Sequence, residues 1–280
     1  MAAGASAARG PAAPGVAPGP AGEVLRVGGA GLVAAAALGA AAGAVLVRGL
    51  TGTARGRRVV DVAVCAAGRL PGPWRTTSAQ VDPYQAWWDE QNERALTGRT
   101  GDGPLLVVLG DSAAQGVGAS APDRGWVGQV LGRLPERDGW PWRAVNLSRS
   151  GARTREVVDV QVPRLAEVTR RHDVALVVAV VGGNDATHTD AATWRDDADD
   201  LLAALPPGAV VSTVAQGWRE AKVRPLNDHV RSSAAERGLR VADVWAHTGP
   251  PYRGRYADGF HPNDVGYAQW ADAVLEALDS

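Results

Sequence analysis

The chain has 280 residues, of which 45% are hydrophobic and 21% are charged, with a formal net charge of −1 at pH 7. This composition excludes a wholly disordered chain, and the near-neutral charge gives no support to a nucleic-acid partner, whose binding surface would be basic. Cys65 is the only cysteine, which excludes an intramolecular disulfide and a zinc site built from cysteines.

The N-terminal region divides into two segments of different character. Residues 1–26 are rich in alanine, glycine and proline, so we expect a disordered tail. Residues 27–47 contain no charged residue, and about 20 apolar residues allow a helix to cross a bilayer. We therefore predict a transmembrane helix at 27–47 and a membrane-anchored, single-pass protein, with a buried core helix as the alternative. The flanking arginines leave the side of the membrane open.

Residues 48–100 are predicted to form a linker that contains a short packing helix. Pro71 and Pro73 interrupt regular structure in this segment. After Pro83, apolar and aromatic residues recur at helical spacing, namely Tyr84, Trp87, Trp88, Ala95 and Leu96. We expect this helix to pack on the domain that follows, with contact to a membrane surface as the alternative.

Strand and helix patterns alternate over residues 101–280. The apolar runs that indicate strands are 105–109, 143–147, 174–181, 208–214 and 239–245. Amphipathic helices are expected between them, at about 124–135, 154–170, 190–204, 219–237 and 264–279. This alternation predicts one α/β domain at 101–280, with a parallel sheet covered by helices on both faces.

Polar residues follow the first of these strands directly, because the run 105–109 ends in Gly110-Asp111-Ser112. Open α/β sheets bind ligands outside the carboxyl ends of their strands, so Ser112 lies where a nucleophile would be placed. Taken alone, Asp111 and Ser112 are more typical of a helix cap.

Three further loops are expected at the same edge of the sheet, and together with Ser112 they supply the groups that acyl transfer needs. Ser112 is the candidate nucleophile and His261 the candidate base, with Asp258 close enough to orient the imidazole. The candidate donors to an oxyanion are the backbone N–H groups of Ser112 and Gly151 and the side-chain amide of Asn184.

These motifs, Gly110-Asp111-Ser112, Gly151, Gly182-x-Asn184-Asp185 and Asp258-x-x-His261, resemble in their order those of the SGNH hydrolases, also called GDSL-like esterases. The resemblance covers about residues 104–280. It implies a flavodoxin-like three-layer α/β/α sandwich with a five-stranded parallel sheet. It also implies an esterase or lipase-like hydrolase. Such an enzyme acts on lipid, glycan or small acyl esters and needs no metal or organic cofactor. Ala113 departs from the family pattern, which has leucine after the serine.

Two alternatives stay open at this point. An acyltransferase would use the same acyl-serine but pass the acyl group to a sugar or lipid hydroxyl. A module of the same fold could bind a glycan or lipid without turning it over. No large lid segment is recognisable, so we expect a shallow, open site. The sequence makes no prediction of oligomeric state.

Two groups of charged residues have competing interpretations. Arg149 and Arg153 flank Gly151, where they would favour an anionic substrate by charge-assisted pairing, or would be ordinary surface arginines. The acidic residues Asp196, Asp197, Asp199 and Asp200 lie on a predicted helix. We expect them to form its solvated face and not a metal site.

Overall fold

The computed structural model describes residues 73–280 with the exception of residue 218. The chain divides into two units, Met1–Leu46 and Val47–Ser280, and every described residue belongs to the second. The predicted disordered tail and the predicted transmembrane helix at 27–47 lie outside the described residues and stay predictions. Among the helices of the described part, none has the length and hydropathy needed to cross a bilayer.

Five parallel strands form the sheet, in the order β2-β1-β3-β4-β5. The strands are β1 (Leu105–Gly110), β2 (Arg143–Asn146), β3 (Leu176–Val180), β4 (Val210–Ser212) and β5 (Arg240–Ala242). Every residue of β1 and β3 is buried, as expected for central strands of a sheet that is covered on both faces. The prediction of a five-stranded parallel α/β fold is confirmed.

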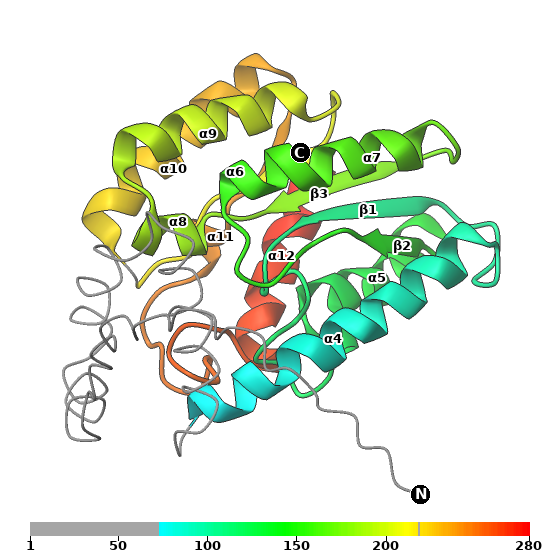
Figure 1. Ribbon diagram of the computed structural model, residues 1–280, viewed down its shortest axis with the longest axis horizontal. Helices are drawn as coiled ribbons and strands as arrows, with labels where there is room; N and C mark the ends of the chain where they lie inside the picture. The colour runs from blue at the N-terminus through cyan, green and yellow to red at the C-terminus, as the bar shows by residue number, and fades with distance from the viewer. Residues whose placement is uncertain (1–72, 218) are drawn as a thin grey trace, which may run out of the picture. The chain divides into compact units, whose positions relative to one another are not determined.

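Helices cover both faces of this sheet and complete three layers (Figure 1). Along β1, Leu105 and Val107 contribute to one hydrophobic core and Leu106 and Val108 to the other, because successive side chains of a strand point to opposite faces. The first core is closed by α7 (Val162–Thr169), α9 (Ala191–Ala204) and α10 (Glu220–Glu236). The second is closed by α5 (Trp126–Asp138) and α12 (Asp264–Asp279).

The helix expected at 154–170 is divided by a turn of π-helix. It consists of α6 (Thr154–Glu156), the π segment η2 (Val157–Gln161) and α7. The buried Gln161 in this turn accepts a hydrogen bond from the Gly110 N–H and donates one to the Gly110 carbonyl, both at 2.8 Å. The irregular turn therefore fixes the backbone just before Ser112, a position typical of π-bulges near functional sites.

Helix α4 (Pro73–Leu96) precedes the sheet and packs along β2. It extends about three turns upstream of the segment expected to be helical. Pro83 lies inside it, although proline removes a hydrogen bond from a helix interior. Both Pro83 and Ala79, whose carbonyl loses its partner, are exposed, so this interruption lies on the solvent side of the helix. On the opposite side Trp88 and Ala95 are buried in the two cores.

Candidate active site

Ser112 lies on a tight turn directly after β1. Gly110 has φ +154°, and a Cβ there would lie 2.2 Å from the Val180 carbonyl oxygen, so only glycine fits. The Asp111 Oδ1 accepts a hydrogen bond from the Ala113 N–H at 2.9 Å and closes the turn. This geometry ends the strand abruptly and places the Ser112 side chain at the carboxyl edge of the sheet.

The structure brings three of the predicted residues into one hydrogen-bonded chain. The Ser112 Oγ lies 3.0 Å from the His261 Nε2, and the His261 Nδ1 lies 2.8 Å from the Asp258 Oδ2. Since a carboxylate only accepts, Nδ1 carries the proton and Nε2 is left to accept from the serine hydroxyl. The arrangement has the connectivity of a nucleophile, a base and an orienting carboxylate.

Asp258 is held as a carboxylate by the groups around it. Burial on its own raises its pKa, but hydrogen bonds and charge from His261, together with the Thr77 hydroxyl, lower the pKa to about 2. Its Oδ1 accepts the N–H groups of Phe260 and His261 at 2.9 and 2.7 Å. Four donors therefore fix this side chain, and it stays ionised at neutral pH.

Asn184 connects the serine turn to the loop that carries Gly151. It belongs to the short helix α8 (Gly183–His188), which the sequence analysis did not predict. Its Nδ2 donates to the Ala152 carbonyl at 3.0 Å and to the Asp111 Oδ2 at 3.3 Å. The side-chain amide thus contacts the residues next to Ser112 and Gly151, whose N–H groups are the other predicted donors to an oxyanion.

Two buried carboxylates support this junction. Burial raises the pKa of Asp111 to about 6. Burial also raises the pKa of Asp185, which accepts the N–H and hydroxyl of Thr154, both at 2.9 Å, and the hydroxyl of Thr189. Asp185 therefore ties the start of α6 to α8, a structural role that its position in the Gly182-x-Asn184-Asp185 motif did not reveal.

A cavity of about 460 Å³ opens beside His261 and Asp111. The ends of β3 and β4 and the loop before α12 line this space, and the expectation of a shallow, open site stays a prediction. The walls are mainly apolar and include Val180, Val181, Val214, Tyr256, Phe260 and Trp270. The volume lies in the range of small-molecule pockets, about 300–1,000 Å³.

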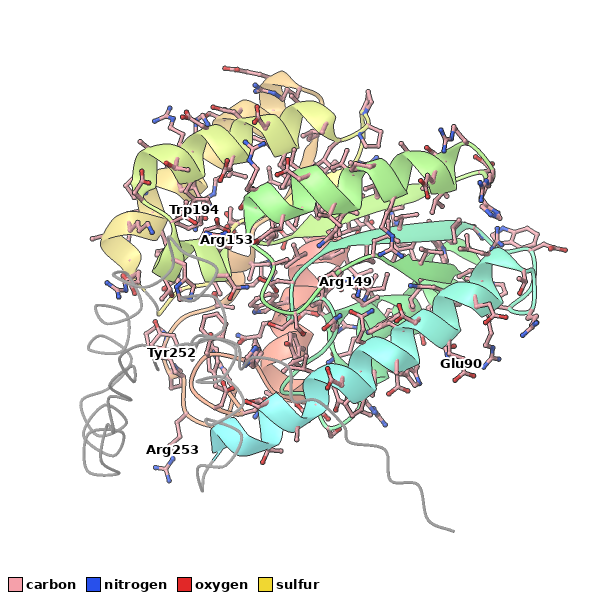
Figure 2. The ribbon with its side chains drawn as sticks, viewed as in Figure 1. Glu90, Arg149, Arg153, Trp194, Tyr252 and Arg253 are labelled. Atoms are coloured by element: carbon pink, nitrogen blue, oxygen red, sulfur yellow. The ribbon has the colours of Figure 1, made fainter. Side chains whose placement is uncertain are left out.

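Neither arginine predicted to bind substrate lines this cavity. Arg149 is exposed, and Arg153 forms an ion pair with Glu156 at 3.1 Å. Their predicted substrate role stays a prediction. A different arginine, Arg253, lies at the cavity next to Tyr252 and extends outward from the loop before α12 (Figure 2).

Three acidic residues of α9, Asp197, Asp199 and Asp200, pair with neighbouring helices. Asp197 is buried and forms an ion pair with Arg155 at 2.8 Å, so the prediction of a fully solvated face is wrong at this position. Asp199 contacts His229 of α10 at 2.9 Å. The described residues contain no cluster of acidic, histidine and cysteine side chains suited to a metal ion.

One polar contact at the site comes from outside the predicted motifs. The buried hydroxyl of Thr77, in α4, donates to the Asp258 Oδ2 at 2.7 Å. Thr77 could not be recognised as a site residue from the sequence, because a threonine in a helix has no local feature that reveals a partner 181 residues away.

The comparison with protein families now gives the class of this chain. Residues 108–269 match the model of the GDSL-like lipase/acylhydrolase family. The chain belongs to this family, the SGNH or GDSL-type serine hydrolases that act on ester bonds. No curated protein matches it in sequence.

Solved structures with the same architecture cover the described domain. The lipase Lip_vut3 from a goat rumen metagenome is 16% identical, with a TM-score of 0.54, over 62% of this chain and 97% of its own. The α/β hydrolase LAE5 from the Lake Arreo metagenome is 20% identical, with a TM-score of 0.52, over 63% and 95%. An acetyl xylan esterase variant from Geobacillus stearothermophilus is 20% identical, with a TM-score of 0.51, over 64% and 96%. At these identities the likeness shows the fold.

Proposed function

We propose that the chain cleaves a carboxylic ester through an acyl-enzyme on Ser112. The Ser112 oxygen attacks the acyl carbon while His261 Nε2 takes the hydroxyl proton, and Asp258 stabilises the imidazolium. The tetrahedral intermediate collapses when His261 returns this proton to the departing alkoxide. Water then attacks the acyl-serine by the same proton route and releases the acid and the free serine. The observation that carries the proposal is the continuous chain from Ser112 Oγ through His261 to Asp258.

The negative charge of both tetrahedral intermediates would be held by the N–H groups of Ser112 and Gly151 and by the Asn184 amide. This assignment is supported by the position of Asn184 between the two loops. Loss of one such donor typically lowers turnover about 100- to 1,000-fold.

The cavity supports an ester with an apolar group of modest size as the substrate. Its apolar walls beside His261 would take up a short acyl or aryl group by the hydrophobic effect. The similar folds include proteins described as a lipase and as an acetyl xylan esterase, and both kinds of substrate contain an acyl ester. We propose a lipid, glycan or small-molecule ester of this kind.

Hydrolysis of p-nitrophenyl esters of increasing chain length by the full chain tests this function. We expect turnover by the unmodified protein and an optimum at short or medium chains, set by the cavity volume. Ser112→Ala should retain the fold and lose activity by about 10⁴-fold or more. The control is Ser280→Ala, which removes a hydroxyl far from the triad that bonds to the Ala277 carbonyl. Equal activity of the Ser112→Ala protein would refute the proposal.

A further inference from the structure

Helix α4 presents one polar face to the loops of the candidate active site. The members of this face recur every three or four residues and so lie on one side of the helix. Gln80 accepts from the Gly118 N–H and donates to the Ala119 carbonyl, and Tyr84 donates to the same carbonyl. Trp88 donates to the Gln115 carbonyl. The face therefore holds the segment that follows Ser112.

The first residue of this face reaches the candidate triad itself. Thr77 is 2% exposed, and its Oγ1 lies 2.7 Å from the Asp258 Oδ2. The same oxygen accepts the His261 Nδ1–H at 2.8 Å. An ionised carboxylate has no proton to give, so the threonine hydroxyl is the donor. Among the residues that the structure describes, four groups donate to Asp258, and this one alone comes from outside its own loop.

We propose that Thr77 is a positioning residue for the reaction, which holds the Asp258 carboxylate in the orientation that aligns His261 with Ser112. The inference rests on the proposed function and adds a residue that lies outside the family match at 108–269. Its hydroxyl contacts the candidate triad at the Asp258 carboxylate, so it acts through Asp258 and not on the substrate.

Removal of the hydroxyl has two physical consequences. The buried Oδ2 loses a charge-assisted hydrogen bond, so the carboxylate becomes freer to rotate and His261 is aligned less well. The negative charge on Oδ2 is also less dispersed, which favours the protonated imidazole. Turnover should fall, and the acid limb of the kcat/KM profile should move to higher pH. The other titratable groups that interact with the pair are Asp111, near His261, and Tyr267, near Asp258, and the substitution leaves them in place.

The test compares Thr77→Val, Thr77→Ala and Thr77→Ser in the full chain, with p-nitrophenyl butyrate as the probe, from about pH 5 to about pH 9. For the valine and alanine variants we expect kcat about tenfold lower, an unchanged KM and an acid limb about half a pH unit higher. Thr77→Ser keeps the donor and should restore both values. Thermal unfolding of each variant identifies loss of fold.

The matched control is Thr97→Val, which removes the hydroxyl that caps the far end of α4 by donating to the Glu93 carbonyl at 2.7 Å. It should change neither the kcat nor the pH profile. A folded Thr77→Val or Thr77→Ala protein with the pH profile and kcat of the unmodified chain would overturn the inference. So would a lower kcat that Thr77→Ser does not restore. A failure of the proposed function itself gives a different result, because ester hydrolysis would then persist in the Ser112→Ala protein.

Discussion

Asp111, next to the candidate nucleophile Ser112, lowers the free energy of unfolding at neutral pH. Burial is the main cause that raises its pKa from 3.8 to about 6, against the Ala113 N–H, which lowers it. Because the folded value is the higher one, the ionised carboxylate disfavours folding above about pH 6, and this penalty disappears below about pH 4. The difference corresponds to about 3 kcal/mol. The same carboxylate accepts the Asn184 amide, so it contributes to the site at the expense of stability.

At Gly118, the loop that follows Ser112 lies against the loop that carries His261. One added methyl group at this position would push the two loops apart. Its φ is +100°, and a Cβ would lie 2.8 Å from the His261 Cβ and 2.3 Å from the Pro262 carbonyl oxygen. We predict that Gly118→Ala moves the imidazole away from Ser112 and lowers kcat/KM about 100-fold. It should also destabilise the fold by about 1–3 kcal/mol. Ester hydrolysis and thermal unfolding measure the two effects.

Gly132 provides the control for this substitution. It lies inside α5, and a Cβ there would meet nothing within 4 Å. Gly132→Ala should leave kcat/KM unchanged and stabilise the helix by about 0.5–1 kcal/mol. Unimpaired hydrolysis by Gly118→Ala would show that the two loops do not depend on this close approach.

At the scale of elements, the short helix α8 is held at its C-terminal end by a cation from α10. The Lys222 Nζ donates to the carbonyls of Asp185, Ala186 and Thr189 and lies 5.2 Å from the centre of the Trp194 ring. A positive charge at a helix C-terminus is stabilising. Because α8 carries Asn184, this contact also sets the position of a candidate oxyanion donor.

Lys222→Met is expected to weaken both the fold and the reaction. The methionine keeps the apolar stem but removes the charge and the three hydrogen bonds, so the free energy of unfolding should fall by about 2–3 kcal/mol. The kcat should fall more than KM changes, because Asn184 loses its support. Urea unfolding and ester kinetics measure these values. Arg224→Met, on the same helix and over Trp245 at 5.1 Å, is the control and should cost under about 1 kcal/mol. Equal losses in both variants would contradict this role of Lys222.

The elements themselves were largely predictable from the sequence. Buried strands such as 105–109 are continuous apolar runs between turn residues, and the long helices have an apolar stripe, so both have local signals. Segments whose form depends on tertiary contacts were not predictable. The π turn at Val157–Gln161 exists where Gln161 reaches Gly110, and α8 exists where Lys222 covers its end.

At the scale of the whole molecule, the parallel sheet brings the chemical groups together. The three groups lie far apart in the chain but meet at one edge of the sheet. Ser112 follows β1, Asn184 follows β3, and His261 lies in the loop just before α12. Motif order was therefore sufficient to predict the candidate triad. The cavity and the contact of Thr77 with Asp258 were not predictable, because they depend on how α4 and the loop before α12 pack on that edge.

The central claim is that Ser112 is acylated with the help of His261, and covalent trapping tests it most directly. The full chain is treated with a fluorophosphonate, and the modified peptide is located by mass spectrometry. We predict one adduct, on Ser112, that forms about 10³-fold or more slowly in His261→Ala and does not form in Ser112→Ala. An adduct on another residue, or ester turnover that continues after Ser112 is blocked, would contradict the account.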